Sequence, residues 1–381
     1  MKSIGSIKES VFNCNRCGNC QYYCPSFAVS RLETHVARGR LQLLKKNLDT
    51  QSAVSDTFSK RVNQCLLCGN CSQNCPAGIH VEELMEFARE FGIARSGPSR
   101  PMELTAKNIA DVGNITGDSR ENRLLWFENM EAGSVRVGET AEYLYFAGCV
   151  PTLYPSSYSI PQTFSSLLNK AGLNWSTLGA SENCCAYPLV IGGMAGEAVA
   201  VMERNARELA ASGAKYLVTT CPSCYHMWKE IYPKTVADMP DIKIYHSSSL
   251  LAELAGAGAF KFKETPCVVT YHDPCDLGRK SGVYDEPRRI IESIPGARLK
   301  EMKFARENAF CCGGGGNLEM SDPALSGKIA GLRIEQAQAT GAEIIVTSCQ
   351  QCKRTLMSGA RQKRARIKVM DLSEFVLSAI E

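Results

Sequence analysis

No stretch of the sequence approaches the ~20 consecutive apolar residues that a membrane-spanning helix requires. The segment from Met1 to Ser10 also lacks the apolar core of a signal peptide. We therefore expect a cytoplasmic protein with no direct membrane span, associated with the cytoplasmic face of a membrane at most through a partner.

An excess of charge of either sign is also missing. The formal net charge is +4 over 381 residues, so the charge balance gives no indication of nucleic-acid binding. The sequence contains no dinucleotide-binding fingerprint and no flavin motif. The sequence therefore gives no indication of a nucleotide cofactor.

Cysteine, by contrast, is abundant, with 19 residues. Disulfide frameworks are typical of short secreted chains, and this chain is neither short nor evidently secreted. An odd count, C-x-x-C spacings and adjacent pairs fit metal ligation in a reducing compartment better. Thiolates select iron–sulfur clusters, zinc or Cu(I).

The run C-x2-C-x2-C-x3-C-P, typical of bacterial ferredoxins, occurs twice near the N-terminus. Three cysteines with two residues between neighbours can bind one cluster. The fourth cysteine, which the following proline directs away from the first three, binds the other cluster. A zinc site would instead use two C-x-x-C pairs. The sequence thus predicts one [4Fe–4S] cluster held by Cys14, Cys17, Cys20 and Cys75, and another held by Cys65, Cys68, Cys71 and Cys24. Apolar residues near helical spacing in Arg31–Leu48 and after Val81 predict that this region is helical.

A second cysteine pattern occurs twice in the remainder of the chain. Each copy has one cysteine, then an adjacent pair, then a C-x-x-C, and the copies are offset by about 127 residues. The first copy comprises Cys149, Cys184, Cys185, Cys221 and Cys224, and the second comprises Cys275, Cys311, Cys312, Cys349 and Cys352. Five thiols exceed the four that a cubane or a zinc ion needs. One is then spare, or is a catalytic thiol, or the set holds an unusual cluster.

Strands and helices alternate in both copies. The segment from Gly213 to Cys221 aligns with that from Gly341 to Cys349, and each reads as a helix stop, a buried strand and a cysteine at the strand's carboxyl end. A helix is expected directly after each C-x-x-C. Such alternation predicts small parallel sheets with their sites at the strand ends. We expect a multidomain α+β and α/β protein with a helical two-cluster domain (1–95), a helical linker (96–141) and two α/β repeats (142–262 and 263–381) related by a pseudo-twofold axis.

The two repeats match the pattern of cysteine-rich CCG domains. Together with the N-terminal motifs they make the chain resemble the D subunit of heterodisulfide reductase over nearly its whole length. This resemblance implies that each five-cysteine set holds a noncubane [4Fe–4S] cluster, and that a disulfide such as CoM-S-S-CoB binds between them and is reduced to two thiols. It also implies an electron-transfer partner, either a membrane cytochrome b-type subunit or a flavoprotein.

Two features of the repeats differ from the family pattern or lie outside it. Ala186 stands where the family motif has glycine, and Tyr187-Pro188 follows it in place of the glycine run Gly313–Gly316. We expect an altered loop there, with the cluster unaffected. The glycine run lacks the continuation of a phosphate-binding loop and is better explained as a loop packed against a cluster. Cys267 lies in a strand outside the motif and reads as a structural residue.

Disulfide reduction also needs protons, and His272, three residues before Cys275, is the candidate donor that the sequence places best. A turn-capping role for His272 is the alternative.

The same domain order occurs in iron–sulfur subunits of glycolate, D-lactate and glycerol-3-phosphate dehydrogenases, where a separate flavoprotein does the chemistry. Those subunits often have an incomplete five-cysteine set. Both sets are complete here, which favours disulfide reduction over pure electron transfer. Related subunits of sulfur-metabolising membrane complexes remain a third possibility.

Overall fold

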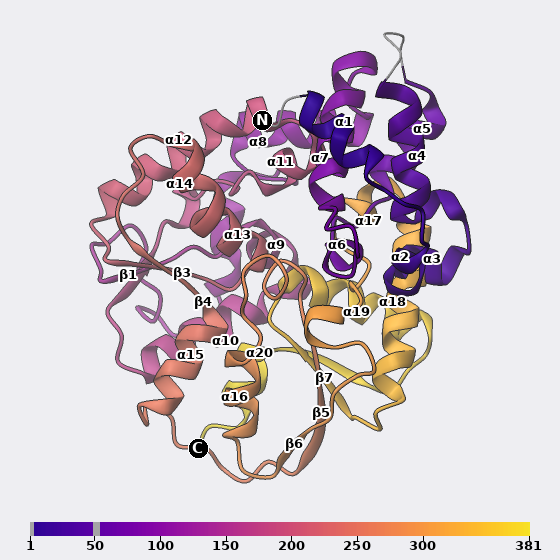
Figure 1. Ribbon diagram of the computed structural model, residues 1–381. Coiled ribbons are helices and arrows are strands. Elements are labelled where there is room, and N and C mark those ends of the chain that lie inside the picture. Colours follow the sequence, from indigo (N-terminus) through magenta and orange to yellow (C-terminus); the bar gives the residue numbers. More distant parts are fainter. Residues whose placement is uncertain (1–3, 49–53) are drawn as a thin grey trace.

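The computed structural model describes residues 4–48 and 54–381, and it divides them into a helical part and two α/β repeats (Figure 1). The helical part consists of α1 (Ile4–Phe12), α2 (Asn19–Tyr23), α3 (Pro25–Ser30), η1 (Glu33–His35), α4 (Ala37–Leu48), α5 (Asp56–Asn63), α6 (Asn70–Gln73), α7 (Val81–Ser96), α8 (Arg100–Val112) and η2 (Arg120–Phe127). Among the described residues, none of the helices has the length and apolar character needed to cross a membrane.

The first repeat contains a parallel sheet of four strands in the order β2-β1-β3-β4. Its elements are β1 (Tyr143–Tyr145), α9 (Cys149–Leu153), η3 (Pro155–Ser157), α10 (Ser159–Lys170), β2 (Trp175–Thr177), η4 (Gly179–Ser181), α11 (Tyr187–Gly192), α12 (Ala195–Ser212), β3 (Tyr216–Thr219), α13 (Pro222–His226), η5 (Met227–Ile231), α14 (Tyr232–Thr235), β4 (Lys243–His246) and α15 (Ser247–Gly256).

The second repeat has a sheet of the same size, in the order β6-β5-β7-β8 and again all parallel. Its elements are β5 (Cys267–His272), α16 (Glu286–Glu292), β6 (Ala297–Leu299), η6 (Arg306–Asn308), α17 (Leu318–Ser321), α18 (Pro323–Gln338), β7 (Ile344–Thr347), α19 (Gln350–Gln362), β8 (Lys368–Asp371) and α20 (Leu372–Ser378). The predicted combination of a helical N-terminal part with parallel-sheet repeats is confirmed.

Two helix caps show how the sequence sets the ends of helices beside these sheets. Gly213 caps the C-terminus of α12 with a left-handed backbone (φ 66°), which lets the chain turn directly into β3. Asp371 accepts the amide of Ser373 and forms a capping box with Glu374 at the start of α20.

One apolar core joins the two repeats. Tyr145, Val218 and Tyr245 of the first sheet belong to the same buried cluster as Val269 and Val346 of the second. Between the sheets, α10 packs on α20 and α15 packs on α16 (Figure 1). In each contact a helix that follows a repeat's first strand meets the last helix of the other repeat. This reciprocal packing is what a pseudo-twofold axis would produce, and the axis itself stays a prediction.

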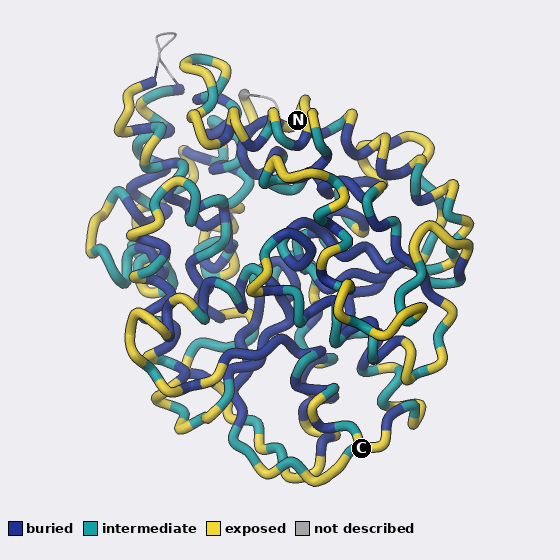
Figure 2. Tube along the Cα trace, turned by 180° about the vertical axis from the view of Figure 1, so that it is seen from behind, coloured by how far each residue is buried: buried dark blue, intermediate teal, exposed yellow. Residues whose placement is uncertain are grey.

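The helical part lies against both repeats. Helix α3 packs on α18 of the second repeat, and α7 packs on α11 of the first. Buried residues lie mainly in the interior of the molecule, and exposed residues lie mainly on its outer turns and helices (Figure 2).

Two local expectations need correction. The helix expected over Arg31–Leu48 is shorter, because Arg31 is left-handed (φ 56°), a short 3-10 turn follows it, and α4 begins only at Ala37. The helix expected after each C-x-x-C begins instead within it, at Pro222 and Gln350, so that Cys224 and Cys352 lie in its first turn.

Candidate metal centre

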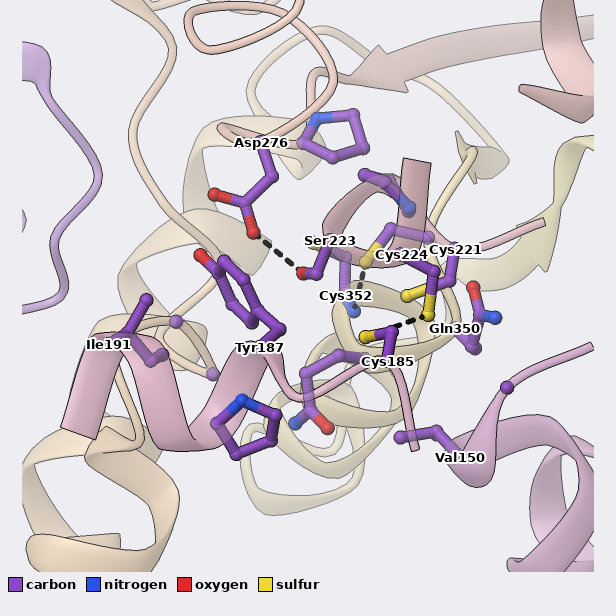
Figure 3. Close-up of a pocket in the computed structure, with 18 of the residues that line it drawn as sticks. Val150, Cys185, Tyr187, Ile191, Cys221, Ser223, Cys224, Asp276, Gln350 and Cys352 are labelled. Carbon is purple, nitrogen blue, oxygen red and sulfur yellow. Dashed lines mark hydrogen bonds between the residues drawn. The ribbon is translucent and has the colours of Figure 1, made fainter. Parts of the chain in front are cut away.

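All ten cysteines of the repeated pattern line a single cavity of about 180 Å³. They reach it from the carboxyl ends of the parallel strands: Cys221 and Cys349 follow β3 and β7 by two residues, and Cys149 and Cys275 follow β1 and β5. Parallel sheets place their binding sites at this edge. Figure 3 shows Cys185, Cys221 and Cys224 of the first repeat together with Cys352 of the second among the residues that line the cavity.

Within each repeat the five sulfurs contact one another in the same order. In the first, Cys149 pairs with Cys184, Cys184 with Cys185, Cys185 with Cys224, and Cys224 with Cys221. The Cys224 thiol donates to the Cys185 sulfur at 3.3 Å. The second repeat has the corresponding chain of contacts through Cys275, Cys311, Cys312, Cys352 and Cys349.

The second cysteine of the adjacent pair has the same acidity in both repeats. Hydrogen bonds from Cys184 and Cys224 lower the pKa of Cys185 to about 6. Hydrogen bonds from Cys311 and Cys352 likewise lower the pKa of Cys312 to about 6. A lowered pKa favours the thiolate, which is the form that binds metal.

The eight N-terminal cysteines form two further groups, each around a small cavity. One cavity is lined by Cys24, Cys65, Cys68 and Cys71. The other is lined by Cys14, Cys17, Cys20 and Cys75, and Cys71 lines it as well. In both cases the cysteine before proline lies with the three cysteines of the other motif, as the spacing predicts.

Comparison with known proteins matches both cysteine-rich parts of the chain. The description "4Fe-4S dicluster domain" matches residues 10–79, and "Cysteine-rich domain" (CCG) matches residues 143–229 and 269–357. The chain is 30% identical to the D subunit of the dihydromethanophenazine:CoB–CoM heterodisulfide reductase of Methanosarcina mazei, over 97% of this chain and 93% of that protein. The chain belongs to the family of heterodisulfide reductase D subunits. It is an iron–sulfur oxidoreductase subunit.

Two other similarities are more distant. An EtfAB:quinone oxidoreductase from Syntrophomonas wolfei is 26% identical over 97% of this chain and 58% of its own length. A crystal structure of a hypothetical protein from Helicobacter pylori aligns with a TM-score of 0.57 at 11% identity, covering 90% of this chain and 72% of that one, and supports the fold alone.

The donor chemistry of the four groups fits the iron–sulfur clusters of the heterodisulfide reductase family. Each group offers thiol sulfur as its ligand atoms, the donor that such clusters require. Burial raises the pKa of Cys20, Cys24 and Cys68 to about 11, which favours the thiol, and binding of a metal cation to these sulfurs would release their protons.

The two halves of the cavity differ at the loop after the adjacent cysteine pair. Ala186 is left-handed (φ 68°), as Gly313 is at the corresponding position (φ 103°), so the alanine keeps the backbone conformation of the family's glycine. The expected change therefore lies beyond Ala186, where Tyr187 begins α11 and lines the cavity.

The glycine run of the second repeat packs against the second ferredoxin motif. A Cβ atom on Gly315 would lie 3.0 Å from the Leu66 carbonyl oxygen and 3.2 Å from the Cys311 sulfur. A Cβ on Gly316 would lie 2.3 Å from the Cys65 carbonyl oxygen. The run is thus glycine because two cysteine groups approach each other there, which supports the interpretation as a cluster-side loop.

Asp276 is the one aspartate or glutamate side chain among the residues that line the cavity, and no lysine or arginine lines it. It forms an ion pair with Lys280 at 3.1 Å and accepts from the Ser223 hydroxyl at 2.7 Å (Figure 3). The Tyr187 hydroxyl accepts from Lys280 at 3.0 Å. The carboxylate is therefore compensated, and the rest of the lining is sulfur, backbone, the hydroxyls of Ser223 and Tyr187, and apolar or amide side chains.

Sequence reasoning missed three charged groups that lie at the sulfurs: Asp276, Arg123 and Arg279. Arg123 donates to the Cys149 sulfur at 3.2 Å and pairs with the buried Glu182 at 3.1 Å. Arg279 donates to the Cys68 carbonyl at 2.5 Å. Arg123 lies 26 residues before the nearest cysteine of its site, and no spacing rule points to it.

His272 does not line the cavity. It is buried behind the cysteines, where a ring nitrogen lies within 4.8 Å of Cys312 and Cys352, and its Nδ1 accepts from Arg333 at 3.0 Å. Burial and the nearby Arg333 hold the pKa of His272 well below its usual range, so the ring stays neutral. The proton-donor role stays a prediction, and His272 is not among the residues that line the cavity. In the first repeat the residue three positions before Cys149 is Phe146, which has no titratable group.

The close approach at Gly316 predicts a selective loss of stability. Gly316→Ala and Gly282→Ala both introduce a side chain at positive φ (60° and 74°), which costs about 1–2 kcal/mol. Gly282 has open space around it, whereas Gly316→Ala also forces apart two backbone segments, which adds about 1–3 kcal/mol. We expect the thermal unfolding midpoint of the anaerobic protein to fall clearly further for Gly316→Ala, and equal falls would contradict the packing described.

Proposed function

We propose that the protein is the electron-transferring and catalytic subunit of a disulfide reductase related to heterodisulfide reductase. In this proposal, electrons travel through two cubane [4Fe–4S] clusters to the cavity between the repeats, where a disulfide is reduced to two thiols. The observation that carries the proposal is the convergence of two complete five-cysteine sets on one cavity.

The proposed ligands follow the four groups of cysteines. The two cubane clusters would be held by Cys14, Cys17, Cys20 and Cys75, and by Cys65, Cys68, Cys71 and Cys24. The two further [4Fe–4S] clusters, which we propose to be noncubane, would be held by Cys149, Cys184, Cys185, Cys221 and Cys224, and by Cys275, Cys311, Cys312, Cys349 and Cys352. The proposed domain limits of 1–95, 96–141, 142–262 and 263–381 are supported by the ranges of the matching family descriptions.

The order of the cysteine groups in space supports a route for electrons. Cys17 is exposed, so the group that contains it would be the one that a partner can approach. Cys71 lines both small cavities, and Cys68 of the inner group is close enough to Cys275 for the two charges to interact. The inner group is therefore adjacent to the second repeat, and the second repeat shares the cavity with the first.

Iron–sulfur clusters in these positions would supply electrons one at a time. A disulfide takes up two electrons and two protons and leaves as two thiols. This chain's own contribution is to hold the disulfide between the facing sulfurs and to surround it with buried, largely apolar residues such as Ile191 and Pro188. Since no lysine or arginine lines the cavity, its lining is suited to a disulfide whose neighbouring atoms are uncharged.

The partner would be a further subunit that delivers electrons to the exposed group, either a membrane cytochrome b-type subunit or a flavoprotein. With the former, the protein would lie on the cytoplasmic face of the membrane without spanning it.

The second candidate function is electron transfer without disulfide chemistry. It is favoured by the similarity to EtfAB:quinone oxidoreductase, whose name describes a redox protein without a disulfide substrate. In that case the repeats would hand electrons on, and the cavity would hold no thiol.

Exposure of the oxidised protein to thiols separates the two functions. We expect EPR spectra of anaerobically purified protein to gain a new paramagnetic species when a mild oxidant is added in the presence of coenzyme M or uncharged 2-mercaptoethanol. The physical reason is that a thiol entering the cavity meets the sulfurs of both repeats. Ferredoxin-like signals unchanged by both thiols, together with copurification of a flavoprotein, would favour electron transfer and overturn disulfide reduction.

The exchange of cysteines between the two ferredoxin motifs gives a second test. Cys24→Ser should impair the cluster of Cys65, Cys68 and Cys71 and leave that of Cys14, Cys17 and Cys20 intact, because Cys24 lies at the former cavity. Total iron should fall by up to about four atoms per chain, as expected for one cubane. Iron analysis and EPR of the reduced variant measure both effects.

Cys267→Ser is the matched control, because Cys267 lies on β5 outside all four groups and should leave the iron content unchanged. Loss of the signal from the Cys14, Cys17 and Cys20 group in Cys24→Ser would show that the motifs are not exchanged.

A further inference from the structure

Arg279 lies between the inner ferredoxin motif and the cysteines of the second repeat. Its Nε donates to the carbonyl oxygen of Cys68 at 2.5 Å. Its Nη1 donates to the carbonyl oxygens of Glu307 and Ala309 at 3.0 and 2.8 Å. These bonds fix the plane of the guanidinium group, because its donors have a rigid geometry.

The remaining nitrogen of Arg279, Nη2, is buried and has no hydrogen-bond partner among the described residues. The charges that act most strongly on the guanidinium are those of the Cys68, Cys275 and Cys311 sulfurs. A buried N–H donor without an acceptor is costly. The unpaired Nη2 of Arg279 therefore indicates that an acceptor bound by the cysteines would lie beside it.

No carboxylate of the described residues forms an ion pair with Arg279. The corresponding cation of the first repeat is different, since Arg123 contacts the Cys149 sulfur but is neutralised by Glu182 at 3.1 Å. A buried arginine keeps its charge and needs an anion nearby. The first repeat therefore presents a neutral pair to its sulfurs, and the second presents an uncompensated cation.

We propose that Arg279 is a fixed positive charge shared by the inner ferredoxin-type centre and the centre of the second repeat, and that it raises the reduction potentials of both. The inference rests on the proposed binding of clusters by these cysteines. Reduction adds negative charge to a cluster, so a nearby cation stabilises the reduced form. Electrons arriving from the outer centre then collect beside the cavity, in the second repeat before the first.

The experiment is a potentiometric titration of the anaerobic protein followed by EPR. In Arg279→Gln, we expect the midpoint potentials of the inner ferredoxin-type centre and of the second-repeat centre to fall, while those of the outer centre and of the first-repeat centre stay. Arg279→Lys retains the positive charge, so its midpoint potentials should stay close to those of the wild-type protein. Arg289→Gln, an exposed arginine on α16, is the surface control and should change none of the potentials.

A second pair of variants tests the charge without removing the bonds of Arg279. The Tyr284 hydroxyl lies close enough to the Arg279 guanidinium group for the two to interact electrostatically. Tyr284→Glu places a carboxylate beside the guanidinium and should lower the same two potentials, whereas Tyr284→Gln should not lower them. If Arg279→Gln folds poorly, the comparison of Tyr284→Glu with Tyr284→Gln tests whether the charge of Arg279 sets the two potentials.

Unchanged potentials in both Arg279→Gln and Tyr284→Glu, or equal shifts of all four centres, would overturn the inference. A wild-type protein that contains iron only in the ferredoxin motifs would instead contradict the proposed function, so the two failures are distinguishable.

Discussion

Ten thiol sulfurs held around one cavity are the constraint on which the rest of the structure depends. Sulfurs so close together are stabilised as metal ligands, and the chain must bring them from segments far apart in sequence. Each repeat does so with a parallel sheet whose strands end at the cavity. The shared apolar core, with α10 on α20 and α15 on α16, then holds the two sheet edges towards each other.

Much of this arrangement could be predicted because cysteine spacing is directly tied to chemistry. The position of Cys221 and Cys349 just after a buried strand predicted their place at the sheet edge, and the proline after Cys24 predicted its transfer to the other ferredoxin group. The exact start of the helices could not be predicted, because Pro222 and Gln350 are compatible with both a loop and a first helical turn. Ala186 shows a further limit, since a left-handed alanine has no sequence signature.

The charged groups at the sulfurs were beyond sequence reasoning for a physical reason. Arg123 and Arg279 reach their sites through tertiary packing, and arginines on a sequence are usually solvated. His272 is close to Cys275 in sequence, but it lies behind the lining residues. Its ring is near the sulfurs of Cys312 and Cys352 and accepts a hydrogen bond from Arg333 of α18.

The two repeats have the same sulfur contacts but different surroundings. The first adds Tyr187 and the Arg123–Glu182 pair, and the second adds the glycine run and the uncompensated Arg279. Both repeats contact the helical part beyond the adjacent cysteine pair, the first through α11 on α7 and the second through Gly315 and Gly316 against the backbone of Cys65 and Leu66. The duplication is therefore chemically unequal, because a helix follows the pair in one repeat and a glycine run follows it in the other.

The iron and acid-labile sulfide content of the anaerobically isolated protein tests this account most directly. Four clusters predict about sixteen iron atoms per chain, with a matching amount of sulfide. About eight iron atoms per chain, with zinc or no metal at the ten cysteines of the repeats, would contradict it.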